Sequence, residues 1–559
     1  MNADVLVYRK EAVARYWQRW LPPLLLLIIG FYLVPLVHTC RLACVPGDMG
    51  DARFNGVILE HFYRWLTGHE SSLISPRFFF PMPGAVTFSD NHWGTAWLYS
   101  LYRMLGANEY QAFDLWYMGS YVLNFLACHW VLRRFGFSSL ASALGAFAFS
   151  FAMPVIARHG HAQLGYRFLV PIALLCWQRF RESGRWLWLG WVALAVTGQF
   201  YLSIYIGYFL VLLLGSWACA QVFVEKVWPW KWFLPGAHIG DPGKRRELLW
   251  VVAMAALAVV ALAALLHPYL HYSKLYGFHR GLDEIKDLLP RLRSYVLADG
   301  SLIWGNLGRV LVPDISMRHE QQIFFGVGIL GLSTLALMKS PSRLCSVAIV
   351  SILLLVALTV DVRGHSIYLY LVNLPGTNSI RAIARIGLIL AMPFSVLVAC
   401  GVDAVRGRGM AWMAVVAALS LMMIVESAAM RTVHFDAAQA RSRIEKLRAQ
   451  LPDSLPEDAI IYVQTTPERS FLDAQLDGML LAQLLGRPTF NGYSGNLAPG
   501  YWPSPPTDDK PCLQAAQRLD AAASFYKERL HRPLPAAAYG QVIVPGQATC
   551  EQNSKGKGP

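Results

Sequence analysis

Charged residues are scarce in this chain of 559 residues. Asp, Glu, Lys and Arg make up 15% of it, 55% is hydrophobic, and the mean hydropathy is +0.38. A soluble domain usually carries about 25% charged residues, so this composition excludes an ordinary soluble enzyme and a disordered chain. Cysteine is scarce too. Nine Cys spread over so long a chain exclude a small scaffold held together by disulfides.

Acidic residues are the rarer of the two charged kinds, with 35 Asp and Glu against 49 Lys and Arg, which gives a net charge of +14. Most of the positive residues sit in short clusters between apolar runs. There they orient a protein in a bilayer, so we expect membrane lipids as partners and no nucleic acid. The sequence has no internal repeat. Its first apolar run lacks a small-residue cleavage site, which favours a retained anchor over a removed signal peptide.

Long apolar runs are what the sequence has in abundance. A spanning helix needs about 20 mostly apolar residues. We predict a polytopic, mainly α-helical bundle of about 11 spans over 21–38, 114–132, 138–156, 165–179, 186–203, 205–223, 248–268, 323–338, 344–360, 385–404 and 410–429.

The positive clusters predict how this bundle is oriented. They all fall on one side if the count is eleven and the N-terminus is cytoplasmic, as the positive-inside rule requires. The residues are Arg9, Lys10, Arg15, Arg19, Arg133, Arg134, Arg179, Arg181, Arg185, Lys226, Lys231, Lys244, Arg245, Arg246, Lys339, Arg343, Arg406 and Arg408.

The long segments then lie on the other side, where we expect the chemistry. They are the first outer loop 39–113, a short loop 157–164, the loops 269–322 and 361–384, and everything after 430. A multi-pass protein of the bacterial inner membrane with a periplasmic C-terminus fits this arrangement. Four Cys fall on the outer side. Cys512 and Cys550 are expected to form a disulfide worth roughly 3–4 kcal/mol, and Cys40 with Cys44 is a second, weaker candidate.

The sequence after residue 430 differs in kind from the spans. Its patterns predict helices over 437–451, 471–485 and 519–530, with strands over 459–464 and 539–544. We therefore divide the chain into a membrane domain, 1–430, and a small extracytoplasmic α/β domain, 431–559. The latter ends in a disordered Ser-Lys-Gly-Lys-Gly-Pro tail.

Two acids begin the first outer loop, in the run Gly47-Asp48-Met49-Gly50-Asp51. Asp51 could simply start the helix predicted over 57–66, since a carboxylate stabilises a helix start. That role explains one acid, and a catalytic or substrate-binding role is the alternative for the other. Further along the loop, Asp90 and His92 are either surface residues or part of the same site.

The short loop 157–164 holds two His in a three-residue window, His159 and His161. This spacing is weak evidence for a metal, because a zinc site needs three or four ligands. The alternatives are a plain loop or a set of phosphate donors in which Arg158 and Gln163 join the two His. Arg167 follows closely and is counted with this set.

Positive residues on the outer side oppose the orienting rule and need a reason. Arg381 and Arg385 are four residues apart, on one face of an entering helix. Guanidiniums at that depth are costly unless they meet anions. The anion is either a substrate phosphate, a lipid headgroup, or an acid of the chain such as Asp48, Asp51 or Glu320.

Several short motifs resemble the GT-C class of membrane glycosyltransferases, which take a sugar from a polyprenyl-phosphate carrier. One is the acidic run 47–51 after the first span. A second is His159-Gly160-His161-Ala162-Gln163, similar to a His-Gly-His-Phe-Gln run in the lipid-linked glucosyltransferase branch. The runs Asn378-Ser379-Ile380-Arg381-Ala382-Ile383-Ala384-Arg385 and Phe490-Asn491-Gly492-Tyr493-Ser494-Gly495 resemble segments of bacterial YfhO-type membrane proteins.

The resemblance implies an inverting sugar transfer on the extracytoplasmic face. Asp48 would be the first choice for the general base and Asp51 the second. The phosphate charge would be stabilised by Arg381, Arg385 and one of the two His. Some members use Mg²⁺ or Mn²⁺, so Asp48, Asp51, Asp90 and His161 are candidate ligands, although no cation is required. The expected partners are a polyprenyl-phosphate-linked sugar and an acceptor that is a glycan, a lipid or a protein. The expected substrate-binding residues are Asp90, His92, His159, His161, Gln163, Arg167, Glu320, Arg381 and Arg385.

Three other functions stay open at this point. A polysaccharide polymerase or ligase also uses lipid-linked sugars, but relies on Arg and His in a late loop. A transporter or flippase would need ionisable groups at mid-membrane depth, where the predicted spans have few. A non-catalytic membrane scaffold would be indifferent to loss of either first-loop acid.

Overall fold

The structure is a computed structural model that describes residues 19–227, 232, 242–338, 342–374, 377, 380–501, 511–547 and 550. It is mainly helical, with 66% helix and 4% strand. Several residues named above lie outside the described residues: Arg9, Lys10, Arg15, Lys231, Lys339, Asn378, Ser379 and the tail 551–559.

Each of the eleven predicted ranges contains a helix. The first is Arg19–His38, which ends in α2 (Pro35–His38). The others are α5 (Glu109–Arg134), α6 (Ser139–Phe151) with α7 (Met153–Ile156), α8 (Leu169–Ser183), α9 (Leu187–Leu202), α10 (Ile204–Glu225), α12 (Pro242–Tyr276), α15 (Gly326–Leu335) with η6 (Ala336–Met338), α16 (Arg343–Thr359), α18 (Gly387–Val405) and α19 (Met410–Ala428).

Six helices among the described residues are long and apolar enough to cross a membrane. They are Arg19–His38, Ser139–Ile156, Ile204–Glu225, Gly243–Tyr276, Ile383–Val405 and Met410–Ala428. The helices Leu187–Leu202, Gly326–Met338 and Arg343–Thr359 are apolar but shorter. A helix rises about 1.5 Å per residue, so these helices of 13 to 17 residues cover only about 20–25 Å of the roughly 30 Å hydrocarbon core.

Helix α18 is the centre of the bundle. Nearly all of its side chains are buried, and it packs against α6, α15 and α16. The outer helices α12 and α19 instead expose large apolar side chains, including Leu257, Val259 and Leu421. Exposed apolar surface of this extent is unfavourable in water and favourable in a lipid bilayer. This distribution fits a membrane-embedded protein.

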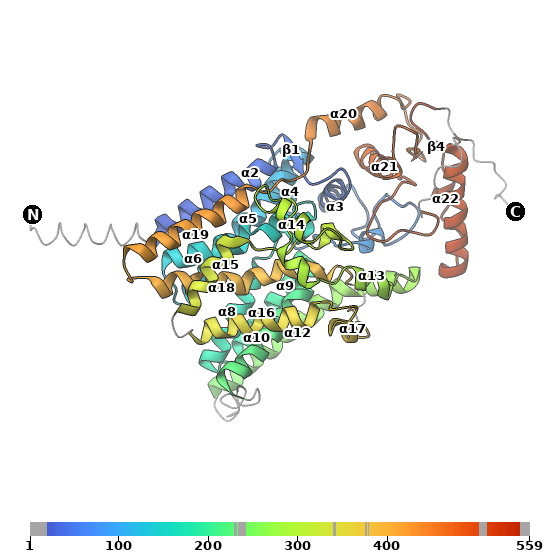
Figure 1. The fold of residues 1–559 in the computed structure, drawn as a ribbon. Helices are drawn as coiled ribbons and strands as arrows, with labels where there is room; N and C mark the ends of the chain where they lie inside the picture. Colours follow the sequence, from blue (N-terminus) through green and yellow to red (C-terminus); the bar gives the residue numbers. More distant parts are fainter. Residues whose placement is uncertain are drawn as a thin grey trace, which may run out of the picture.

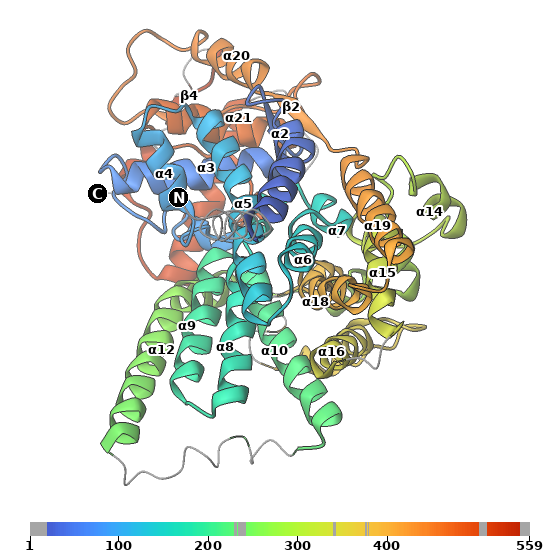
Figure 2. The ribbon, with the colours of Figure 1, turned by 90° about the vertical axis from the view of Figure 1, so that its left-hand side faces the viewer.

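The first outer loop and the C-terminal segment gather at one end of the bundle (Figure 1). The loop contains α3 (Asp51–Leu66), η1 (Ala85–Phe88) and α4 (Ala96–Met104). Shorter elements between the long helices are α13 (Leu282–Asp287), η4 (Leu292–Val296), α14 (Gly305–Leu311), η5 (Arg318–Glu320), α17 (Tyr368–Leu371) and η8 (Ile383–Ile386). Figure 2 views the bundle end-on, with α20 and α21 above α8, α9 and α12.

The C-terminal segment has α20 (Ala437–Arg448), β3 (Ile460–Ile461), α21 (Phe471–Leu485), α22 (Pro511–Phe525), η9 (Tyr526–Leu530), η10 (Ala536–Tyr539) and β4 (Val542–Ile543). Strands β3 and β4 pair in parallel. Strand β2 (His434–Asp436) pairs antiparallel with β1 (Cys44–Pro46) of the first loop. The predicted helix over 471–485 is matched by α21. The helix predicted over 519–530 begins earlier, at Pro511, and the predicted strands are shorter than expected.

This segment shares a hydrophobic core with the first loop. Phe54, Phe79 and Phe88 of the loop pack with Met479 and Tyr501 in one cluster of buried residues. The backbone joins them as well, because the amides of Phe79 and Phe80 donate to the carbonyls of Asn491 and Thr489 at 2.9 and 3.0 Å. The C-terminal segment and the first loop are therefore held together in a fixed arrangement.

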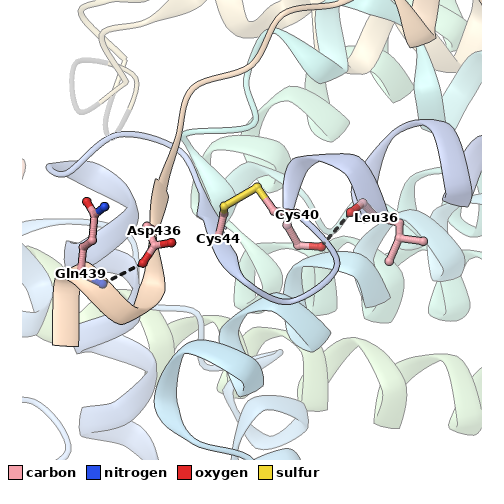
Figure 3. The surroundings of a disulfide bond; sticks show 6 residues. Leu36, Cys40, Cys44, Asp436 and Gln439 are labelled. Carbon is pink, nitrogen blue, oxygen red and sulfur yellow. Dashed lines mark hydrogen bonds between the residues drawn. A yellow bond between two sulfur atoms is a disulfide. The ribbon is translucent and has the colours of Figure 1, made fainter. Parts of the chain in front are cut away.

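Both predicted disulfides are present, Cys512–Cys550 and Cys40–Cys44. The second joins Cys40 to the first residue of β1, beside the strand that ends at Asp436 (Figure 3). Asp436 accepts a hydrogen bond from the Gln439 amide at 2.8 Å and so begins α20. The five free cysteines are Cys128, Cys176, Cys219, Cys345 and Cys400, all in bundle helices.

Candidate functional site

The two acids of the first loop have different surroundings. Oδ1 of Asp48 accepts hydrogen bonds from the amides of Gly50 and Asp51 at 3.0 and 2.9 Å, so Asp48 stabilises the start of α3. Gly47 makes the approach of a second loop possible. It has φ +109°, and a Cβ there would lie 2.7 Å from the Cβ of Ala52 and 3.1 Å from the Cα of Gly160. The loop 157–164 therefore packs directly on the acidic loop.

That approach places His161 against Asp51. His161 Nδ1 lies 2.9 Å from Asp51 Oδ2, and the hydroxyl of Tyr493 donates to Asp51 Oδ1 at 2.9 Å. On the other side of the ring, Nη2 of Arg385 lies 3.2 Å from His161 Nε2. Nε2 also lies 3.5 Å from Oε1 of Glu320. A guanidinium can only donate, so the shorter contact with Arg385 requires Nε2 as the acceptor, and in that tautomer the proton of His161 is on Nδ1, facing Asp51.

Glu320 holds Arg385 in its position next to His161. Its carboxylate binds Arg385 through two contacts, Nη2–Oε1 at 2.6 Å and Nε–Oε2 at 3.2 Å, and binds Nη1 of Arg158 at 3.0 Å. All three side chains are at most 8% exposed. Such a buried pair requires good geometry and further partners. These include the carbonyls of His319 and Glu320 for Arg158 and the ring of Tyr205, 5.1 Å from Arg385 Cζ.

Asp51 and Glu320 both have a lowered pKa. Burial opposes ionisation of Asp51, but the interactions with His161 and Tyr493 and the charge of Arg385 outweigh it and lower its pKa. For Glu320, burial is likewise outweighed by Arg158 and Arg385, which hold its pKa well below the usual range. The two acids differ in how far their side chains are exposed to solvent. The Asp51 side chain is 33% exposed, whereas that of Glu320 is 5% exposed.

A small cavity of about 20 Å³ adjoins the cluster. Its walls include Arg158, His159 and His161 together with Tyr117 and Asn124 of α5. A cavity of this size holds about one water molecule when polar groups surround it.

A second group of charged side chains, from Arg280, Glu284 and Arg381, comes from α13 and from the residues just before α13 and η8. Nη1 of Arg381 binds Oε1 of Glu284 at 2.6 Å, and Nη1 of Arg280 lies 3.6 Å from the same oxygen. Arg280 also donates to the Gly495 carbonyl at 3.0 Å. Two guanidiniums share one carboxylate here, so this group has an excess positive charge. The Arg381 side chain is 39% exposed and accessible to a ligand.

Other predicted site residues form a separate network. Asp90 accepts hydrogen bonds from the Ser203 hydroxyl at 2.7 Å and the Ile204 amide at 3.2 Å, and burial raises its pKa to about 6. His92 contacts Oδ1 of Asn55 at 2.8 Å, and Asn55 donates to Gln163 at 3.1 Å. His92 is fully buried, which lowers its pKa to about 3. These contacts join the first loop to the bundle.

The remaining two predicted site residues, His159 and Arg167, contact backbone groups of segments distant in the sequence. His159 lies 3.0 Å from both the carbonyl and the amide of Val433, where the chain leaves the bundle, and burial lowers its pKa. Arg167 is completely buried and donates to the carbonyls of Leu388 and Phe149 at 3.0 and 3.2 Å. The structure does not bring Arg167 to the cluster around Asp51.

The residues present do not fit a divalent cation. Asp51 and His161 contact each other, and the adjacent guanidinium of Arg385 would repel a metal ion. Asp90 accepts hydrogen bonds from Ser203 and Ile204, and Oδ1 of Asp48 accepts hydrogen bonds from two backbone amides. In the described part of the chain, the one cluster with metal-ligand distances is Cys40, Cys44 and His434, and both of its thiols are in a disulfide.

Sequence reasoning did not name Tyr493, Glu284 or Arg280 as site residues. Tyr493 reaches Asp51 from 442 residues away, and Glu284 is 97 residues from Arg381. Arg280 offered a signal, because it is a positive residue on the predicted outer side. Arg385 was expected to meet a substrate phosphate or an acid of the chain, and in the structure it meets Glu320.

The fold and cluster together define a mainly helical, membrane-embedded protein with a buried ionic network at one end of its bundle. The chain belongs to the family of the domain of unknown function DUF6311, whose model matches residues 25–425. No curated protein matches the chain.

Proposed function

We propose that this protein is an inverting membrane glycosyltransferase that takes a sugar from a polyprenyl-phosphate donor on the extracytoplasmic face. The observation that carries the proposal is the contact of the partly exposed Asp51 with His161, which Arg385 and Glu320 hold in place. An acid from the first loop and a guanidinium from a late loop thereby meet at one site. The resemblance to the GT-C class is an independent support.

Asp51 is the general base of this reaction, in preference to Asp48. Each carboxylate oxygen has two lone pairs. Tyr493 occupies one lone pair of Oδ1 and His161 lies against Oδ2, so each oxygen of Asp51 retains at least one lone pair for the acceptor. As the acceptor oxygen forms its bond to the anomeric carbon, its proton passes to Asp51, and the bond from that carbon to the phosphate oxygen breaks. The electron pair leaves with the polyprenyl phosphate.

The departing phosphate gains negative charge and needs a positive partner. Arg381 and Arg280 supply it, because they share one carboxylate and Arg381 is partly exposed. Arg385 has a different role. Its guanidinium is satisfied by Glu320 and orients His161, so we assign it to positioning.

The proposed orientation has eleven spans, with the N-terminus cytoplasmic and the site periplasmic, in a bacterial inner membrane. The long outer segments and the site then lie at the same end of the bundle as α20 and α21. The polyprenyl tail of the donor would remain in the bilayer beside the apolar outer helices.

The test is transfer of radiolabelled sugar from a panel of polyprenyl-phosphate sugars by the full chain in membranes. Asp51→Asn should lower kcat by about 10²–10⁴-fold, the usual contribution of a general base. Asp48→Asn keeps an acceptor oxygen for the amides of α3 and should lose less than about tenfold. Asp314→Asn, at an exposed outer acid, is the matched control and should be unchanged.

Transfer at the full rate by a folded Asp51→Asn variant would refute the assignment. Full transfer by that variant together with loss in Arg381→Gln would favour the polymerase or ligase chemistry. If the unchanged chain transfers no sugar from any donor of the panel, a transporter or a scaffold is favoured instead.

A further inference from the structure

A large polar cleft lies in the C-terminal segment, apart from the ionic cluster. It has a volume of about 1100 Å³ and lies between α20, the loop 464–469 and the residues 544–547 that follow β4. Ligand pockets usually measure about 300–1,000 Å³. The cleft therefore has room for a ligand larger than one sugar.

The lining is rich in groups that both donate and accept hydrogen bonds. Four amide side chains and two hydroxyls face it: Gln439, Gln450, Gln464, Gln547, Ser442 and Thr466. In the part of the chain that the structure describes, the side-chain amides of Gln439, Gln450 and Gln464 have no hydrogen-bond partner. Sugar hydroxyls also both donate and accept, so an amide is a suitable partner for them. The ring of Phe435 adds one apolar face.

The charges of the cleft are mixed, with a slight positive excess. Its acids already have partners, since Asp436 begins α20 and Glu468 accepts from the Thr466 hydroxyl at 3.0 Å. Arg443 and Arg469 face the buried Asp477 at 2.7 and 3.5 Å. Lys446 has no ion pair among the described residues, so its charge is available to a ligand.

The cleft reaches the proposed catalytic loop. Met49 is one of its lining residues, and it lies between Asp48 and Asp51 in the sequence. Consecutive Cα atoms are about 3.8 Å apart, so Met49 is within about 8 Å of the Asp51 backbone. A ligand in the cleft would therefore end close to the general base.

We propose that this cleft binds the acceptor, and that the acceptor is an oligosaccharide of several sugar units. This inference rests on the proposed function and names the acceptor's chemical class. The amide-rich lining favours a glycan, since a lipid tail would need a largely apolar wall. The end of the glycan nearest Met49 presents the hydroxyl that Asp51 deprotonates.

The first test measures binding without catalysis. The full chain in nanodiscs is titrated with fluorescent glucose oligomers of one to six units, with a matched series containing uronic acids, and with a mixture of unstructured peptides. Anisotropy should show affinity that rises with glycan length in at least one series. A Lys446→Gln, Gln464→Ala double variant should bind at least fivefold more weakly, and Lys527→Gln, an exposed control, should bind as the unchanged chain does.

The second test separates this inference from the proposed function. The double variant should raise the acceptor KM and leave the rate of donor hydrolysis unchanged, whereas Asp51→Asn should bind glycans normally and lose transfer. Glycan binding with full transfer by Asp51→Asn refutes the proposed function alone. Peptide binding in place of glycan binding, no glycan binding, or equal binding by the double variant overturns the cleft as the acceptor site.

Discussion

Asp51 differs from its neighbour Asp48 in the origin of the groups that bind it. Asp48 interacts with its own loop, whereas Asp51 contacts His161 from the loop after α7 and Tyr493 from the C-terminal segment. The protonation of Asp51 therefore depends on how three distant parts of the chain are assembled. A change at any one of them should alter the pH at which Asp51 loses its charge.

The pH dependence of transfer tests this. Because the pKa of Asp51 is below its ordinary value near 4, the base stays ionised and the rate should be independent of Asp51 titration between about pH 5 and 7. The rate should fall only below about pH 4. Tyr493→Phe removes one hydrogen bond to the ionised form, so the acidic fall should move to higher pH in a kcat/KM profile.

The control for this shift is Tyr539→Phe, at an exposed tyrosine of η10. An acidic fall that stays in place or moves to lower pH in Tyr493→Phe would contradict the role given to that hydroxyl. The stability of the folded chain should also decrease at acidic pH. A carboxylate with a lowered folded-state pKa contributes stability above the unfolded value near 4, and that stability is lost as the pH falls through the folded pKa.

Part of this site could be predicted from the sequence. Asp51 was named from the acidic run of the first loop and His161 from the window of two His, whereas Arg385 was named because guanidiniums next to a span are costly unless they meet anions such as Glu320. Their pairing could not be predicted, because the choice among Asp48, Asp51 and Glu320 for Arg385 depends on three-dimensional distance. For the same reason Arg167 was grouped with His161 by sequence proximity, although it lies among the bundle helices.

Helices α3 and α21 are joined by a buried ionic contact. Nη2 of Arg53 lies 2.5 Å from Oδ1 of Asp477, and both side chains are at most 1% exposed. Arg443 of α20 reaches the other carboxylate oxygen. One carboxylate therefore links the helix that begins with Asp51 to two helices of the C-terminal segment.

Loss of that carboxylate should be strongly destabilising. Asp477→Asn leaves the buried Arg53 without its closest anion, and removal of one partner of a buried pair costs about 3–5 kcal/mol. Arg53→Met should cost less, since Arg443 and Arg469 still neutralise Asp477. The measurement is guanidinium unfolding of the purified chain in detergent.

Asp473→Asn is the matched control, because Asp473 is 27% exposed and 3.8 Å from Arg53. It should cost less than about 1 kcal/mol, as partly exposed pairs do. An equal cost for Asp473→Asn and Asp477→Asn would show that Asp477 does not link these helices.

Helices were more predictable than strands at the scale of elements. Long apolar runs and a helical period identify α10, α18, α19 and α21 from local sequence alone. Strands β3 and β4 have two residues each, and β1 and β2 have three. Such short strands exist through their pairing with distant residues, so a local pattern overestimates their length.

At the scale of the whole molecule, the separation of charge and apolar surface predicts the orientation. The elements α3, α20 and α21 gather at one end of the bundle (Figure 1), which is the predicted outer end. The positive clusters after α5, α8 and α18 belong to the loops predicted to be cytoplasmic. Eleven spans place each loop on the side that the positive-inside rule favours.

Site-directed labelling tests this orientation. Ser183→Cys follows α8 in a predicted cytoplasmic loop, and His365→Cys lies in the predicted outer loop before α17; both positions are exposed. A membrane-impermeant maleimide should label His365→Cys in intact cells and Ser183→Cys only after the membrane is permeabilised. The unchanged chain controls for the native thiols. These two positions are separated by an odd number of proposed spans, five. Labelling of both from the same side would therefore require an even number and would exclude the eleven-span topology.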